Sequence, residues 1–135
     1  MNKPIISIKD FNLSFGSKKI VENLSFEVRK GEIFGFLGSN GSGKTTTIRA
    51  LLGIYQADSG ELLINGKKFS PEDGGKIGYL PEERGLYKKE TVIDTMVYFA
   101  QLKGLSKKDA LENSMKFLKR VGLEDKAKLK VEKLS

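Results

Sequence analysis

The residues with the clearest chemical pattern lie between Gly38 and Thr46, where the chain reads GSNGSGKTT. This stretch matches G-x-x-x-x-G-K-[ST], the spacing of the phosphate-binding P-loop. Glycines let the backbone curl so that consecutive N–H groups face inward and approach an anion closely. Lys44 adds a mobile positive charge for terminal phosphates, and the Thr45 hydroxyl offers an oxygen ligand to Mg²⁺. The pattern therefore predicts a site for phosphates with Mg²⁺.

The segments on both sides of this loop are those that such a site needs. Residues 32–37 form a short apolar run of buried-strand length, and residues 46–52 have the pattern of a helix that ends at Gly53. The N-terminus of that helix would direct free N–H groups and a partial positive charge at the bound anion. This order of strand, loop and helix favours a phosphate site over a glycine turn that matches the motif by chance.

Antiparallel β structure is expected on both sides of the P-loop segment. Residues 5–15 alternate between apolar and polar side chains, and a turn at 16–19 leads to a second strand at 20–28. After the helix, residues 61–64 form another strand, and Asn65-Gly66 signals a tight turn. A last short strand is predicted at 76–80, where Pro81 stops it.

The pattern becomes helical after Pro81. Thr91 and Ser106 are each followed three residues later by aspartate, as at a helix N-cap. The apolar positions at helical spacing are Val92, Ile93, Met96, Val97 and Ala100, then Ala110, Leu111, Met115, Leu118 and Val121. We therefore expect a β-rich part at 1–80 joined to a helical part at 81–135.

Composition narrows the function classes. The 135 residues suit one domain or a piece of one, with 39% hydrophobic and 30% charged residues, as in a soluble globular chain. No apolar run approaches membrane-spanning length, and the N-terminus does not resemble a signal peptide. Cysteine and histidine are absent, which excludes disulfides, thiolate metal sites and histidine base chemistry within these residues. The net charge of +7 comes mostly from scattered lysines, and we interpret it as a solvated basic surface, with no nucleic acid expected as a partner.

Taken in order, these features resemble the first part of the nucleotide-binding domain of an ATP-binding cassette (ABC) transporter ATPase. The resemblance covers essentially the whole chain and rests on Phe15, the P-loop, the loop after residues 76–80, and the terminal Leu134-Ser135. It implies an α/β fold: a P-loop NTPase core with an antiparallel β subdomain, the start of a helical subdomain, and an incomplete central sheet. It also implies that residues 1–80 are an ATP-binding core, that residues 81–135 hold a Q-loop-like segment and the helical subdomain, and that the two parts together make one incomplete domain. The cofactors it implies are ATP and Mg²⁺.

The resemblance also assigns roles to residues outside the P-loop. An aromatic residue at the end of the first strand stacks on adenine in this family, and Phe15 matches that place. Glu82 stands where the family's Q-loop usually has glutamine, so a carboxylate replaces an amide beside Mg²⁺. The predicted nucleotide-binding residues are Phe15, Gly38, Ser39, Asn40, Gly41, Ser42, Gly43, Lys44, Thr45 and Thr46, and the predicted metal ligands are Thr45 and Glu82.

In the family, Leu-Ser at this distance opens the signature motif, and the carboxylates and histidine that complete catalysis come later. The resemblance therefore implies that this chain binds ATP but turns it over very slowly or not at all. It also implies a membrane permease partner that contacts residues 82–96, a second nucleotide-binding domain, and a cytoplasmic position at the inner face of the membrane. Uncovered sheet edges could lead the chain to self-associate. Residues 78–87 look most like ATPases that serve exporters.

Three other interpretations remain. A soluble ABC-type ATPase of DNA repair or translation would carry long insertions in the helical half, whereas here only about a dozen residues separate Leu80 from the helix at Val92. A nucleotide kinase or GTPase would not explain the β structure on both sides of the P-loop segment. A nucleic-acid binder that uses the positive charge would leave GSNGSGKTT unexplained.

Overall fold

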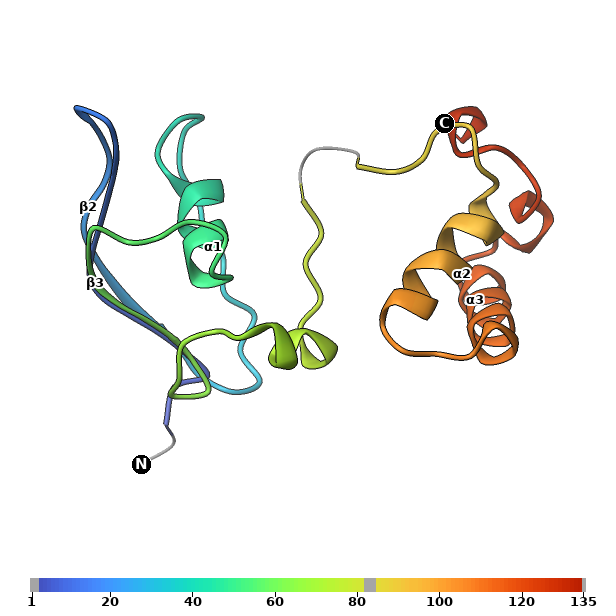
Figure 1. The fold of residues 1–135 in the computed structure, drawn as a ribbon, viewed down its shortest axis with the longest axis horizontal. Coiled ribbons are helices and arrows are strands. Elements are labelled where there is room, and N and C mark those ends of the chain that lie inside the picture. Colours follow the sequence, from blue (N-terminus) through green and yellow to red (C-terminus); the bar gives the residue numbers. More distant parts are fainter. Residues whose placement is uncertain (1–2, 82–84, 135) are drawn as a thin grey trace. The chain divides into compact units, whose positions relative to one another are not determined.

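The structure is a computed structural model that describes residues 3–81 and 85–134 (Figure 1). Its described part separates into two compact units, Met1–Ile77 and Gly78–Ser135, and each is described by itself. The first holds β1 (Ile6–Phe15), β2 (Lys18–Val28), α1 (Lys44–Leu51), β3 (Ser59–Ile64) and the short 3₁₀ helix η1 (Pro71–Lys76). The second holds α2 (Val92–Leu102), α3 (Lys107–Arg120), η2 (Glu124–Lys126) and η3 (Val131–Lys133).

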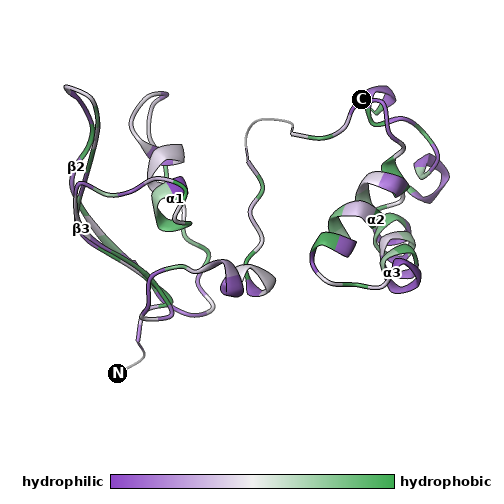
Figure 2. Cartoon of the chain, in the orientation of Figure 1, coloured by the Kyte–Doolittle hydropathy of each residue, from purple (hydrophilic) through white to green (hydrophobic). Residues whose placement is uncertain are grey.

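The first unit is a three-stranded antiparallel sheet in the order β2-β1-β3. The predicted hairpin is present, with a tight turn at Gly16-Ser17. The Asn65-Gly66 turn also forms, because both residues adopt the positive φ that such turns require. Figure 2 shows hydrophobic residues (green) in the sheet and in α1. The core they build is Ile8, Phe11, Leu13, Val21, Ala50 and Leu62, so α1 packs on the sheet through Ala50.

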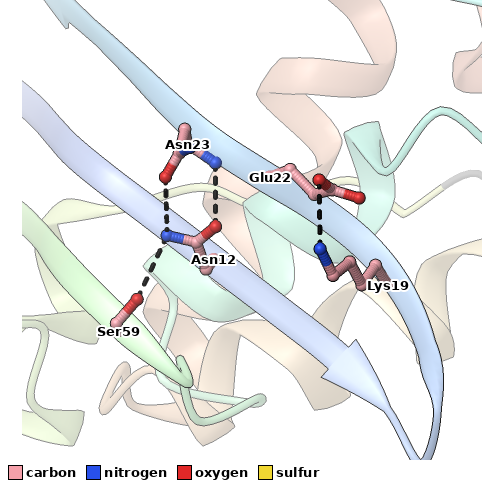
Figure 3. Close-up of polar contacts among 5 residues, drawn as sticks. All are labelled: Asn12, Lys19, Glu22, Asn23 and Ser59. Carbon is pink, nitrogen blue, oxygen red and sulfur yellow. Dashed lines mark hydrogen bonds and ion pairs between the residues drawn. The ribbon is translucent and has the colours of Figure 1, made fainter.

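A polar cluster ties the three strands together near the middle of β1 (Figure 3). The Asn12 amide donates to the Asn23 side chain on β2 at 3.2 Å and to the Ser59 hydroxyl on β3 at 3.1 Å. In return the Asn23 N–H donates to Asn12 Oδ1 at 2.9 Å. Asp10 and Asn23 both have positive φ. They lie where the pairing of β1 with β2 is irregular, and side-chain contacts there hold these two backbone conformations in place. Asn12 is thus a structural link that the alternating pattern did not reveal.

Two predicted strands do not form, namely 32–37 and 76–80. Phe34 and Phe36 both contact Phe26, as alternate residues of an extended segment would, while Ile33 and Leu37 are almost fully exposed. A strand needs a neighbour for its backbone groups, and none lies beside 32–37 in the described residues. Residues 71–76 form η1, so Lys76, expected to begin the second of these strands, ends a 3₁₀ helix instead, and Leu80 is almost fully exposed beyond it.

The second unit contains the two predicted helices. Thr91 and Ser106 are their N-caps, since the side-chain oxygen of each accepts from the N–H of Asp94 and Asp109, respectively, at 3.1 Å. The predicted apolar positions are buried or half-buried in α2, but only some of those predicted for α3 are buried. Ala110, Ser114 and Leu118 are buried there, whereas Leu111, Met115 and Val121 are exposed. No helix among the described residues is both long and apolar enough to cross a bilayer.

An ion pair next to η1 makes a testable pH prediction. The Lys67 ammonium lies 2.8 Å from the Asp73 carboxylate, and this hydrogen bond lowers the pKa of Asp73 and raises the pKa of Lys67. The Asp73 contribution to stability is therefore present above its ordinary pKa of 3.8 and is lost as pH falls through the lowered value. The Lys67 contribution is present below 10.5 and is lost as pH rises through the raised value.

We therefore expect a carboxylate NMR titration of Asp73 to have its midpoint below 3.8. Replacing Lys67 with methionine should move that midpoint upward, because the largest cause of the shift is gone. An unchanged midpoint in the Lys67→Met variant would contradict the assignment.

Candidate functional site

The predicted P-loop leads into α1 in the way its glycines require. Gly43 is the N-cap of α1 and adopts a left-handed conformation, with φ of 90°. A Cβ at this position would lie 2.8 Å from Val21 Cγ2 and 3.0 Å from the Ile20 carbonyl oxygen. Glycine is therefore needed at position 43 for two reasons: its backbone angle and its close approach to β2. Gly41 also has positive φ, but open space surrounds it.

Lys44 begins α1, and its side chain folds back over the loop. Its Nζ donates to the carbonyl oxygens of Gly38 at 2.7 Å and Ser39 at 2.8 Å. The loop is also closed by the Ser42 N–H, which donates to the Ser39 carbonyl at 3.1 Å. The Lys44 ammonium is thus held against the backbone of the loop, where its positive charge can attract an anion.

The first turn of α1 supplies N–H donors at the same place. In the described part of the chain, the N–H groups of Gly43, Lys44 and Thr45 make no backbone hydrogen bond, as expected at a helix N-terminus. Thr47 is already committed to the helix, since both its N–H and its hydroxyl donate to the Gly43 carbonyl at 2.8 Å. Free donors, the helix dipole and one ammonium together can bind a phosphate group.

The two predicted site residues outside the P-loop are Phe15, which the structure describes, and Glu82, which it does not. Phe15 ends β1 and is 50% exposed, so its ring is accessible. Its ring meets that of Tyr55 edge to face, with centroids 5.3 Å apart. No sequence signal joins two aromatics so far apart along the chain, and this contact was not predicted. Glu82 lies outside the described residues.

The donor set decides which metal the site could hold. Among the described residues, no group of three or more acidic or histidine side chains is placed to hold a metal ion. A protein cage for Ca²⁺ or Zn²⁺ is therefore absent from that part of the chain. If phosphates are bound beside it, the Thr45 hydroxyl would suit Mg²⁺, which keeps several waters and is usually bound partly through phosphate oxygens.

Comparison with known proteins now decides the family. The family model described as ABC transporter matches residues 21–135. The chain belongs to the ABC transporter family. It is 41% identical over 133 residues to the uncharacterized ABC transporter ATP-binding protein MJ1023 of Methanocaldococcus jannaschii, covering 98% of this chain and 47% of that protein. It is 39% identical over 134 residues to the bacitracin transport ATP-binding protein BcrA of Bacillus licheniformis, covering 97% of this chain and 43% of that protein.

A solved structure supports the fold. CbiO1 of Clostridium perfringens, part of the ABC transporter complex cbiONQ, matches with a TM-score of 0.78 over 98% of this chain and 56% of that one. At 22% identity this likeness shows the fold alone. The expected α/β fold, a partial P-loop NTPase domain with a small antiparallel sheet, is thereby confirmed. The chain spans less than half the length of the two relatives named above.

Proposed function

We propose that this ABC transporter family chain is the ATP-binding part of an ATPase that energises transport through a membrane partner. The observation that carries the proposal is the Lys44 ammonium, held on the carbonyls of Gly38 and Ser39, together with the N–H groups at the start of α1 that make no backbone hydrogen bond within the described residues. Such a site suits a phosphate chain, because one short segment offers an ammonium and several N–H donors. We assign nucleotide binding to these residues. Hydrolysis of the nucleotide is proposed for the whole protein.

Each predicted residue has a role in this proposal. The backbone of residues 38–43 surrounds the β and γ phosphates, and Lys44 neutralises their charge. Thr45 would hold Mg²⁺, which when bound offsets the charge of the phosphate oxygens. Thr46 adds a backbone donor in the first turn, and Phe15 offers a ring for adenine. Glu82 would contact the metal from the Q-loop position.

The Phe15 role gives a direct prediction. We expect Phe15→Ala to weaken ATP binding by about 1–3 kcal/mol, because base–aromatic stacking is worth that much. Inorganic triphosphate, which has no base, should bind Phe15→Ala and the unchanged chain equally. Isothermal titration with both ligands measures the difference. The matched control is Phe117→Ala, an exposed phenylalanine on α3 that should not alter either affinity. Equal losses for both ligands would contradict base stacking at Phe15.

The membrane partner is proposed to dock on the second unit. An apolar groove of about 470 Å³ lies there between α2 and α3. Its lining residues include Leu86, Val92, Met96, Phe99, Phe117 and Leu134. Some of them fall in residues 82–96, the segment expected to contact a permease. A position at the cytoplasmic face of the membrane and a second nucleotide-binding domain follow from the same proposal.

The direction of transport is proposed to be export, on the likeness of residues 78–87. Relatives include a methionine import protein of Rhizobium johnstonii and a Nod factor export protein of Cupriavidus metallidurans. Family membership therefore does not choose the direction. Vesicles that contain the protein with its permease would decide it by whether ATP drives substrate toward or away from the nucleotide side.

We also propose that residues 32–37 pair with a second copy when the 135-residue chain is studied by itself. In the described structure, Ile33 and Leu37 are exposed and no strand lies beside them, so an unpaired extended segment is open to another chain. Sedimentation velocity should give a weight that rises with concentration. Leu37→Lys should reduce the rise, whereas Leu102→Lys, at an exposed leucine that ends α2, should not. A monomer at all concentrations would contradict pairing.

A further inference from the structure

The ring of Phe15 does not stand alone at the end of the hairpin. Tyr55, from the loop between α1 and β3, meets it with an interplanar angle of 79°. A T-shaped neighbour covers at most one face or one edge of a ring. Phe15 keeps half of its surface exposed, so part of it stays accessible to a ligand. The contact therefore restrains the ring without closing it off.

Tyr55 is itself attached to α1 through two contacts of Arg49, one at its hydroxyl and one at the preceding residue. The Arg49 guanidinium on α1 donates from Nη1 to the Tyr55 hydroxyl at 3.3 Å. The N–H of Ile54 donates to the Arg49 carbonyl at 2.8 Å, which fixes the start of the loop on α1. Tyr55 is thus attached to the same helix whose first turn begins with Lys44.

The other end of the loop is fixed on β1. The Asp58 N–H donates to the Asn12 carbonyl at 2.9 Å. The Asn12 amide donates to the Ser59 hydroxyl at 3.1 Å (Figure 3). Both ends of the short segment that carries Tyr55 are therefore attached to regular structure. A side chain on such a segment can act as a fixed support for a neighbour.

We propose that Tyr55 is a positioning residue that holds the Phe15 ring in place for a purine base, with Arg49 setting the Tyr55 ring. The inference rests on the proposed ATP-binding function and deepens it. A half-exposed phenylalanine at a hairpin end would lose rotational freedom when a base stacks on it. Tyr55 removes that freedom beforehand, and restraining one such side chain changes an affinity by roughly 2- to 10-fold.

The arrangement also relates the base to the phosphates. Lys44 begins α1, Arg49 follows on the same helix, and the Arg49 to Tyr55 to Phe15 contacts continue to the ring. One rigid helix thereby sets both the phosphate donors and the base support. Tyr55 should accordingly matter for ATP and not for a ligand that lacks a base.

The test compares ATP with inorganic triphosphate in the full chain. Tyr55→Ala should weaken ATP by roughly 2- to 10-fold and leave triphosphate within about twofold. Tyr55→Phe keeps the ring but loses the Arg49 contact, so it should recover only part of the ATP affinity. On a Phe15→Ala background, Tyr55→Ala should add no further loss, because its effect passes through Phe15. Equal weakening of ATP and triphosphate, or a full additional loss in the double variant, would overturn the proposal.

A spectroscopic readout separates this proposal from the proposed function. The chain contains no tryptophan, so Phe15→Trp introduces a single reporter at the ring. Its fluorescence anisotropy without ligand should fall when Tyr55→Ala, or Tyr55→Leu if the alanine variant does not fold, is added. Unchanged anisotropy would overturn the support role. If ATP instead binds the unchanged chain no better than a Lys44→Ala variant, the proposed function fails, whereas the anisotropy still decides whether Tyr55 holds the ring.

Discussion

Replacement of Lys44 by alanine is expected to lower the affinity for ATP by roughly 100-fold or more. The reason is the loss of the charge-assisted hydrogen bonds that the proposed function assigns to the ammonium and the phosphates, each worth about 1.5–3 kcal/mol. The variant also loses the two hydrogen bonds by which Nζ closes the loop on the Gly38 and Ser39 carbonyls. Binding would then depend on the N–H groups of the loop and of α1 alone. Equilibrium titration with fluorescent ATP measures the change.

The matched control is Lys19→Ala. Lys19 is an exposed lysine on β2 that pairs with Glu22 at 3.5 Å (Figure 3). Lys19→Ala therefore removes one positive charge from the chain, as Lys44→Ala does. Surface ion pairs of this kind contribute little, and ATP affinity should change by less than about twofold. Lys44→Arg tests geometry, because a planar guanidinium cannot replace the compact ammonium within the closed loop. ATP affinity in Lys44→Ala within threefold of the unchanged chain would remove the basis of the proposed function.

Replacement of Gly43 by alanine should lower the free energy of unfolding of the first unit by about 2–5 kcal/mol. A residue with Cβ at φ of 90° costs about 1–2 kcal/mol. The added methyl group would also lie 2.8 Å from Val21 Cγ2 and 3.0 Å from the Ile20 carbonyl, and overpacking of this kind costs about 1–3 kcal/mol. Moving α1 away from β2 would relieve the clash but would open the core around Ala50.

Chemical denaturation followed by circular dichroism measures this loss, and Gly31→Ala is its control. Gly31 has φ of 87°, close to that of Gly43, but nothing lies within 4 Å of the Cβ it would gain. It should therefore cost only the backbone term, about 1–2 kcal/mol. Equal losses in the two variants would show that the approach to β2 contributes nothing. A smaller loss in Gly43→Ala than in Gly31→Ala would contradict the packing at the N-cap itself.

Much of the fold could be predicted where short-range rules decide. The hairpin, the Asn65-Gly66 turn and the capped starts of α2 and α3 depend on residues close together in the chain. Their predicted positions agree with the structure to within a few residues. The P-loop motif belongs to the same class, because the backbone angles of Gly41 and Gly43 and the reach of Lys44 are local properties.

The two incorrect strands show where local rules fail. Residues 32–37 alternate as a strand should, with Phe34 and Phe36 directed to Phe26, yet they have no neighbour in the described residues to complete a ladder. A short apolar run indicates only that a segment tends to be buried, whereas a strand is defined by a partner that lies elsewhere in the chain. The same reason separates Leu111 and Met115, which are exposed, from Leu118, which lies in one buried cluster with Val92 of α2.

The sequence by itself predicted the phosphate chemistry, because the types and spacing of residues 38–46 match a phosphate-binding loop. It also indicated the family, which comparison then showed. Tertiary structure alone decided that Tyr55 meets Phe15, that Asn12 links three strands, and that Gly43 must approach β2. Each of these depends on residues distant in the chain, and folding brings them together through burial of a shared core that no short stretch specifies.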